Sequence, residues 1–223
     1  MMPKRKVVVF DLDDTLYKEI DYLRSAYRHI ASLVSNARVP EDEVYELMLK
    51  TYNAGGNAFE AVVSRYGLRL FSVEWMLNAY RNHKPKISLD EETRTTLDRL
   101  KVQGIVMGII SDGRVQSQMN KIEALGLKDY VNPGDIIINE CSEYFKPDVR
   151  SYRRFMEKYG ADSAYWYIAD NPAKDFKAPN ALGWTTICLL DDGRNIHPQS
   201  FDHLPGLLPK KKVKTLSEII PLI

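Results

Sequence analysis

The segment Val7-Val8-Val9-Phe10-Asp11-Leu12-Asp13-Asp14-Thr15-Leu16 joins four apolar residues directly to an acidic cluster. The apolar run predicts a short strand that is buried on both faces, as strands of a parallel sheet are. The acidic residues then lie just past its C-terminal end, where open α/β sheets bind their ligands. Asp11 and Asp13, one residue apart, suit a nucleophile with a neighbouring general acid or base.

The acidic cluster has two other interpretations. Taken alone, it is explained equally well as a solvated turn that caps the next helix. A calcium-binding EF-hand loop is excluded, because Leu16 stands where that loop needs Gly and Tyr22 stands where it needs a bidentate Glu. Only residues elsewhere in the chain can show whether this cluster is a capping turn or a reactive site.

The composition is ordinary for a globular protein and excludes several classes. Of the 223 residues, 44% are hydrophobic and 27% are charged, and the formal net charge of +1 gives no electrostatic reason to expect a nucleic-acid partner. No apolar stretch approaches a membrane span, and the run after the basic start is too short for a signal-peptide core. Cys141 and Cys188 are expected to be free thiols, and the four His residues lack zinc-site spacing. We therefore expect a cytoplasmic protein without a membrane partner.

A helical insertion is predicted directly after the acidic cluster. Apolar residues recur with helical spacing in four segments between Tyr17 and Lys86, and no convincing strand interrupts them. The polar, Gly-rich turn Asn53-Ala54-Gly55-Gly56-Asn57 separates the second of these segments from the third. We interpret residues 17–86 as a small helical domain inserted into a core formed by residues 1–16 and 87–223.

From Leu89 onward the pattern alternates between helix and strand. Strands are predicted over residues 105–110, 135–138, 164–169 and 185–190, with a final short strand near Val213. Helices are predicted over residues 92–102, 115–125 and 149–159, after Pro172, and from Leu216. Residues 192–212 show no clear period and are interpreted as an irregular surface excursion. The alternation predicts an α/β fold with a mostly parallel sheet.

Polar residues follow the predicted strands and would meet at one edge of such a sheet. Ser111 follows the second strand, Lys146 precedes the helix after the third, and Asp170 follows the fourth, with Asp175 a little further on. Each has a simpler explanation by itself: Ser111 and Asp170 as helix caps, Lys146 as a surface residue, and Asp175 as an acid at a helix N-terminus. Together with the first acidic cluster, they suit phosphoryl transfer.

A pocket with several carboxylates repels phosphate unless positive charge compensates it. Mg²⁺ prefers oxygen ligands and commonly takes one or two carboxylates together with substrate phosphate. Lys146 can supply a further fixed cation, and Ser111 with nearby backbone N–H groups can donate to phosphoryl oxygens. These residues therefore predict Mg²⁺ as a cofactor and a phosphate ester as the substrate.

The motifs, in this order, resemble those of the haloacid dehalogenase-like (HAD) superfamily. The matching residues are Asp11-Leu12-Asp13-Asp14-Thr15, Ser111, Lys146-Pro147-Asp148 and Asp170-Asn171-Pro172-Ala173-Lys174-Asp175. The resemblance covers essentially the whole core, and residues 17–86 stand where that family inserts its type 1 cap. It implies a Rossmann-like parallel sheet with helices on both faces, plus a small α-helical cap domain.

The resemblance also implies a role for each matching residue. Asp11 would attack phosphorus and form an aspartyl-phosphate, Asp13 would protonate the leaving oxygen and later activate water, and Thr15 would help to position both acids. The residues implied to bind the phosphoryl group are Ser111, Asp112, Gly113 and Lys146. The implied metal ligands are Asp11, Asp13 through its backbone carbonyl, and Asp170, supported by Asn171 and Asp175.

These roles predict a Mg²⁺-dependent phosphatase of a small phosphomonoester, such as a sugar phosphate or a nucleoside monophosphate. Asp13 favours phosphate chemistry, because the dehalogenase branch of the family lacks an acid there. Ala169 departs from the Gly that often precedes Asp170 in the family. The alternatives left open are a phosphomutase on the same scaffold and a phosphate-binding regulatory module that has lost turnover.

The predicted cap would supply substrate specificity. The turn residues Asn53, Gly55, Gly56 and Asn57 are the candidates to meet the substrate, because a polar, Gly-rich turn lets backbone approach closely. A plain connector between two helices is the alternative interpretation of this turn. The sequence identifies neither the substrate nor the oligomeric state.

Overall fold

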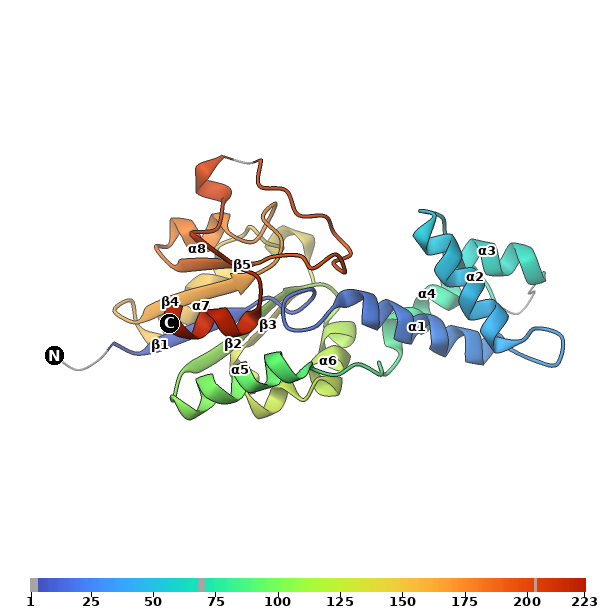
Figure 1. Ribbon diagram of the computed structural model, residues 1–223, viewed down its shortest axis with the longest axis horizontal. Helices are drawn as coiled ribbons and strands as arrows, with labels where there is room; N and C mark the ends of the chain where they lie inside the picture. The colour runs from blue at the N-terminus through green and yellow to red at the C-terminus, as the bar shows by residue number, and fades with distance from the viewer. Residues whose placement is uncertain (1–3, 68–70, 203) are drawn as a thin grey trace.

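The computed structural model describes residues 4–67, 71–202 and 204–223. These residues form a six-stranded sheet in the order β3-β2-β1-β4-β5-β6, and every neighbouring pair is parallel. The strands are β1 (Lys6–Phe10), β2 (Val106–Asp112), β3 (Ile136–Asn139), β4 (Ala164–Ala169), β5 (Thr185–Leu189) and β6 (Lys211–Val213). The predicted parallel α/β sheet is confirmed, and the strand that comes first in the chain lies in its interior (Figure 1).

β1 is buried on both faces, as its apolar run predicts. Val8 and Phe10 pack on one face against α5 (Glu91–Val102), α6 (Val115–Ala124) and the 3₁₀-helix Leu216–Leu222. Val7 and Val9 pack on the other face against α7 (Arg150–Tyr159) and α8 (Lys177–Ala181). Because successive side chains of a strand point to opposite faces, four consecutive apolar residues supply both halves of this core.

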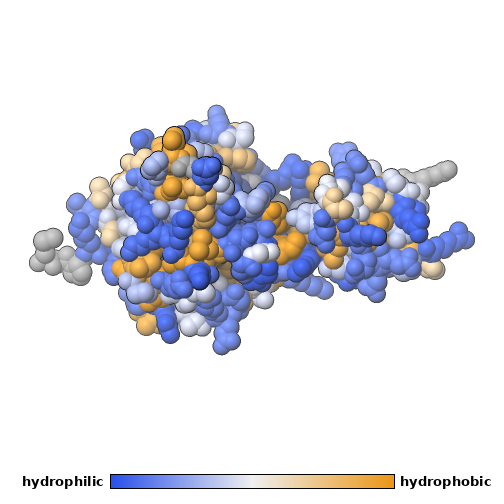
Figure 2. All heavy atoms as spheres, turned by 45° about the horizontal axis from the view of Figure 1, so that its top comes forward, coloured by the Kyte–Doolittle hydropathy of each residue, from blue (hydrophilic) through white to orange (hydrophobic). Residues whose placement is uncertain are grey.

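The first four helices after β1 form a separate part of the molecule (Figure 1). They are α1 (Glu19–Val34), α2 (Glu41–Asn53), α3 (Ala58–Tyr66) and α4 (Val73–Asn82). They enclose an apolar cluster of their own, built around residues such as Ile30, Met48 and Val62. They lie inside the stretch 17–86 that the sequence assigns to a cap, and we call them the cap below. In Figure 2, hydrophilic residues cover most of the visible face of both parts.

Local capping explains where several of these helices begin and end. The Asn57 side chain accepts hydrogen bonds from the first turn of α3, and Gly67 ends that helix in the left-handed conformation. The Asp90 side chain caps α5 in the same way. Among the described residues, no helix combines the length and the apolar character that crossing a membrane requires.

Two predictions about secondary structure were wrong, and a third needs to be extended. Pro172 does not begin a helix: turns follow β4, held by a hydrogen bond of 3.0 Å from the Asn171 N–H to the Asp175 carboxylate, and α8 starts only at Lys177. The segment from Leu216 is a 3₁₀-helix that contains Pro221, whose missing N–H does not suit a regular α-helix. Much of the segment 192–212 is irregular as predicted, but it also contains the 3₁₀-helix Pro205–Leu207 and the start of β6. It is more than a surface excursion, because its first part contacts the site described next.

Candidate active site

The C-terminal ends of the central strands meet at a small acidic hollow of about 170 Å³. Asp11 follows β1, Ser111 and Asp112 end β2, and Asp170 follows β4. The hollow is lined by Asp11, Asp13, Asp14, Glu19, Ser111, Asp112, Asp170, Asn171, Lys174 and His197. The convergence follows from the parallel register, in which Phe10 lies beside both Ile109 and Ile168. A hollow of this size holds a phosphoryl-sized group, and a larger substrate has to extend beyond it.

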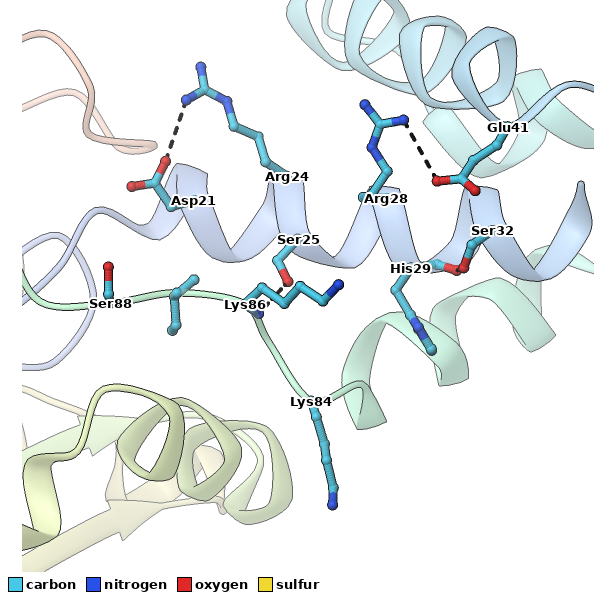
Figure 3. A pocket seen from close by; sticks show the side chains of 11 residues that line it. Asp21, Arg24, Ser25, Arg28, His29, Ser32, Glu41, Lys84, Lys86 and Ser88 are labelled. Atoms are coloured by element: carbon cyan, nitrogen blue, oxygen red, sulfur yellow. Dashed lines mark hydrogen bonds and ion pairs between the residues drawn. The ribbon is translucent and has the colours of Figure 1, made fainter.

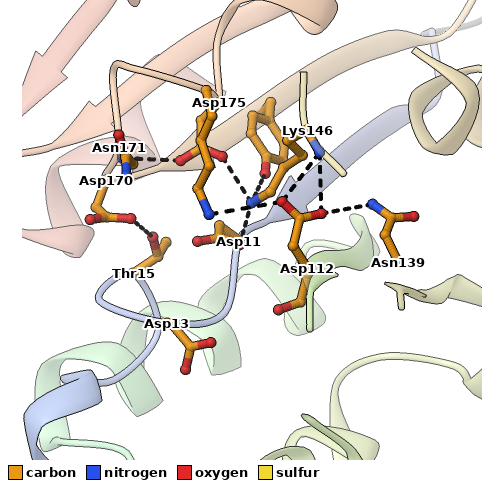
Figure 4. Close-up of polar contacts among 12 residues, drawn as sticks. Asp11, Asp13, Thr15, Asp112, Asn139, Lys146, Asp170, Asn171 and Asp175 are labelled. Carbon is orange, nitrogen blue, oxygen red and sulfur yellow. Dashed lines mark hydrogen bonds and ion pairs between the residues drawn. The ribbon is translucent and has the colours of Figure 1, made fainter. Parts of the chain in front are cut away.

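Lys146 lies at the centre of the cluster in Figure 4. Its ammonium is 2.6 Å from Asp11 Oδ1 and 2.8 Å from Asp175 Oδ1, and it donates to the Tyr167 hydroxyl at 3.2 Å. Burial alone would lower the pKa of Lys146, but the two carboxylates outweigh it and raise that pKa well above its usual value. Lys146 is therefore a permanent buried cation that two acids hold in place.

Asp11, Asp170 and Asp175 form a cluster in which one oxygen of each lies within 4.8 Å of the others. All three are buried. Burial raises the pKa of Asp11 to about 6, against the opposing effect of Lys146, and raises the pKa of Asp170 to about 8, with neighbouring acids adding to that shift. Asp175 Oδ1 makes no hydrogen bond among the described residues, although Lys146 is close. Oxygen donors crowded in this way fit a hard divalent cation.

Thr15 and Asn171 hold the acids in place. The Thr15 hydroxyl is 3.5 Å from Asp170 Oδ1, and the Asn171 backbone N–H donates to Asp175 Oδ2 at 3.0 Å. Asp14 shapes the loop that follows β1. Its backbone is left-handed at φ 55°, and its carboxylate accepts hydrogen bonds from the backbone N–H groups of Glu19 and Ile196. A short acidic side chain is one of the few besides Gly that tolerate this conformation.

The residues at the end of β2 divide into two groups. Ser111 is buried on the hollow, and its hydroxyl accepts a hydrogen bond of 2.6 Å from the Gln118 amide. The Asp112 carboxylate lines the hollow but already accepts the Asn139 amide at 2.9 Å. The Gly113 N–H donates to the Asn139 carbonyl at 2.8 Å. Asp112 and Gly113 thus have a local structural role here, and their predicted contact with phosphate stays a prediction.

The Asp13 side chain points away from the Asp11–Lys146 cluster (Figure 4). It faces α6, where Lys121 Nζ lies 2.7 Å from Oδ1 and Gln118 Nε2 lies 2.8 Å from Oδ2, and the Tyr17 hydroxyl donates to it as well. Burial would raise the pKa of Asp13, but the Lys121 charge and these hydrogen bonds together lower it. Glu19, near the same Lys121, has its pKa raised to about 8 by burial.

Several residues around the hollow were not predicted from the sequence. Gln118 and Lys121 come from the buried side of α6, but polar residues recur along this whole helix, so these two do not stand out in the sequence. Asn195 donates to Asp170 Oδ2 at 3.1 Å, and Gln199 donates to the Asp170 carbonyl at 2.6 Å. Both lie in the irregular segment after β5, whose path depends on contacts with residues far away in the chain. No local pattern marks them.

The predicted specificity turn is exposed at the end of α2. Gly55 has φ +74°, and a Cβ at Gly56 would lie only 2.9 Å from the Thr51 side chain. Asn57 caps α3. Asn53 is therefore the member of this set whose exposed side chain makes no hydrogen bond among the described residues. The neighbouring Tyr52 has its pKa raised by partial burial and by the charges of Glu19 and Asp14, two residues that line the hollow.

A larger hollow of about 640 Å³ lies between α1 and the segment that returns from the cap to the core. Arg24, Arg28, Lys84 and Lys86 contribute to its lining. In Figure 3, the charged side chains point in different directions rather than toward a common point, and Arg24 and Arg28 already pair with acids of the cap. This hollow lacks a converging set of reactive groups, so we place the candidate reaction at the strand ends.

Comparisons with known proteins agree with this placement. The family model for "Haloacid dehalogenase-like hydrolase" matches residues 8–189. Glyceraldehyde 3-phosphate phosphatase of Methanocaldococcus jannaschii is 25% identical over 199 residues, covering 83% of this chain and 85% of that protein. The protein of the same name from Pyrococcus furiosus is 27% identical, covering 83% and 81%. The magnesium-bound structure of the HAD-hydrolase YfnB from Bacillus subtilis has a similar fold, with a TM-score of 0.66 at 18% identity and 99% of both chains covered.

Proposed function

Because this chain belongs to the haloacid dehalogenase-like hydrolases, we propose that it is a Mg²⁺-dependent phosphatase of small phosphomonoesters. The observation that carries the proposal is the buried pair of Asp11 and Lys146, 2.6 Å apart, beside two further acids at the strand ends. A carboxylate that is held beside a fixed cation and opens onto a phosphoryl-sized hollow suits nucleophilic attack on phosphorus.

The reaction proceeds in two displacements. In the first, an Asp11 oxygen bonds to phosphorus as the bond to the ester oxygen breaks, and Asp13 gives that oxygen a proton. Asp13 has to enter this step in its protonated form, although its surroundings lower its pKa. In the second, Asp13 takes a proton from water, whose oxygen attacks phosphorus and releases phosphate and the Asp11 carboxylate. Ser111 and Lys146 bind the phosphoryl oxygens during both steps, because Ser111 lines the hollow and the Lys146 ammonium lies 2.6 Å from Asp11 Oδ1.

Asp11, Asp170 and the Asp13 backbone carbonyl would hold Mg²⁺, with Asp175 and Asn171 fixing the turn behind them. The bound ion supplies charge neutralisation for the phosphoryl group. The acid cluster itself supports this assignment. Three buried carboxylates leave excess negative charge even with Lys146 among them and Lys174 on the lining of the hollow.

The substrate is a small phosphorylated metabolite, a sugar phosphate or a nucleoside monophosphate. The hollow takes the phosphoryl group, so the rest of the substrate extends toward the cap. Residues 17–86 act as a cap domain that closes over it. Asn53 is the turn residue that we expect to contact it, because its exposed side chain makes no hydrogen bond within the described part of the chain. Interdomain movement is a named feature of the YfnB structure. Glyceraldehyde 3-phosphate is the first compound to test, because the relatives from M. jannaschii and P. furiosus are named as phosphatases of this compound.

The experiment is a phosphate-release screen of the purified protein over sugar phosphates, nucleoside monophosphates and glyceraldehyde 3-phosphate, with and without Mg²⁺. We expect Mg²⁺-dependent release from at least one of them. Conversion of a substrate into its isomer without phosphate release would instead identify a phosphomutase. Binding of phosphate without either reaction would identify a regulatory module, and both outcomes would contradict the proposal.

A further inference from the structure

The Asp13 carboxylate is held entirely by groups outside the acid cluster. Among the described residues, its side-chain hydrogen bonds come from Tyr17, Gln118 and Lys121. The Lys121 side chain is only 5% exposed, and its ammonium also lies 4.4 Å from the centre of the Tyr22 ring. A buried ammonium is costly unless it is paired, so this ion pair is a fixed part of the fold rather than a passing surface contact.

Gln118 links Asp13 to the phosphoryl-binding side of the hollow. Its amide nitrogen lies 2.8 Å from Asp13 Oδ2, 2.6 Å from the Ser111 hydroxyl and 3.3 Å from the Asp112 carbonyl. Gln118 is 2% exposed and therefore cannot exchange these partners for water. One buried amide thus fixes the relative placement of the acid/base residue and the predicted phosphoryl ligand.

The same helix also binds the point where the cap returns to the core. The Ser117 hydroxyl donates to the Arg81 carbonyl at 2.7 Å, and the Asn120 amide donates to the His83 carbonyl at 3.0 Å. These carbonyls belong to the end of α4, where the last turn of a helix leaves acceptors without partners inside the helix. Within one turn, α6 therefore contacts both the acid/base residue and the end of the cap.

We propose that Lys121 and Gln118 are positioning residues for Asp13, and that α6 ties this position to the end of the cap through Ser117 and Asn120. The inference rests on the proposed phosphatase function and adds residues that the sequence motifs do not include. Removing Lys121 leaves the Asp13 side chain with fewer fixed partners, so its aim at the leaving oxygen deteriorates. Steps that do not require a proton on the leaving group are affected little.

The test compares two esters in the purified Lys121→Met protein. One is p-nitrophenyl phosphate, whose leaving group departs without a proton, and the other is the best alkyl phosphate from the screen. The ratio kcat/KM reports only the steps up to departure of the leaving group, so water attack in the second displacement does not enter. We expect kcat/KM to fall roughly ten- to hundredfold for the alkyl ester and less than about threefold for the nitrophenyl ester.

Gln118→Met should show the same preference, together with a smaller fall shared by both esters, because it also removes the hydrogen bond to Ser111. It serves as a second variant if Lys121→Met unfolds. Lys128→Met, which removes an exposed lysine just after α6, is the matched control and should leave both esters unchanged. An equal fall for both esters, or no fall for either, in folded variants overturns the positioning role. A wild-type protein that hydrolyses neither ester would instead contradict the proposed function.

The link to the cap is tested by the double variant Ser117→Ala/Asn120→Ala, which leaves both contacts to Asp13 in place. We expect the same selective loss, at roughly three- to tenfold for the alkyl ester. Wild-type behaviour of this variant beside an impaired Lys121→Met would remove the link to the cap.

Discussion

The acid cluster at the strand ends and the turn at the end of α2 differ in how the fold treats them. Asp11, Lys146 and Asp175 are buried and hold one another, whereas Asn53 is exposed and its side chain makes no hydrogen bond in the part of the chain that the structure describes. A buried charge persists only where partners are built around it, so the chemistry is fixed by the fold itself. An exposed turn side chain is free to vary, so specificity can change there without disturbing the reaction.

Replacing the nucleophile should give the largest effect and would show most directly that the reaction lies in the cluster. Asp11→Asn keeps the shape of the side chain but removes the attacking charge, so we expect activity to fall by several orders of magnitude. Activity on p-nitrophenyl phosphate and the thermal unfolding midpoint are to be measured together. Asp129→Asn, at an exposed turn, is the control. Near-normal turnover of a folded Asp11→Asn protein would remove this mechanism.

Removing the metal should lower the activity almost as much as replacing Asp11. We expect EDTA to abolish turnover and Mg²⁺ to restore it, because the carboxylates otherwise repel the phosphoryl group. Asp170→Ala should raise the Mg²⁺ concentration needed for half-maximal activity or eliminate activity altogether. Asp192→Ala, which removes a more exposed acid, should leave that concentration unchanged. Full activity in EDTA would contradict the Mg²⁺ assignment.

When no metal is present, the acid cluster should also lower the free energy of unfolding. Burial raises the pKa of Asp170 from 3.8 to about 8, so the folded state binds a proton that the unfolded state releases between about pH 4 and pH 8. Stability therefore falls as the pH rises through this window. We expect Asp170→Asn to raise the unfolding midpoint of the EDTA-treated protein, more at pH 8 than at pH 5. An equal or lower midpoint at pH 8 would show that the acids do not repel one another.

The cap turn should give the smallest effect, and only with real metabolites. Asn53→Ala is expected to change kcat/KM a few-fold among the esters that pass the screen, and hardly at all for p-nitrophenyl phosphate, whose leaving group barely reaches the cap. Asn53 is a cleaner choice than Gly56, because a Cβ at Gly56 would meet Thr51. Glu46→Ala, exposed on the same helix, is the control. Small and equal changes for all esters would show that the turn only connects α2 to α3.

The core could be predicted in detail because its signals are local. Val7 to Phe10 could be recognised as a strand buried on both faces, and the parallel order of strands then brings Asp11, Ser111 and Asp170 to one edge. The direction in which a side chain points, by contrast, depends on residues that are distant in the sequence. That Asp13 turns toward Lys121 depends on where α6 packs, and that Asn195 reaches Asp170 depends on the path of an irregular segment. Neither follows from periodicity.

β1 is the first strand to be synthesised, yet its partners come from much later in the chain. Val8 lies beside Met107 and Trp166, whereas the cap helices contact one another over short separations. Contacts between distant residues form slowly, and an apolar strand without partners is prone to aggregate while it waits. On the ribosome, the cap can therefore pack early, while Val7 to Phe10 stay unpaired on one side until β4 has emerged. A nascent chain that is halted before Trp166 can therefore fold its cap, but it cannot yet hold Asp11 in the active site.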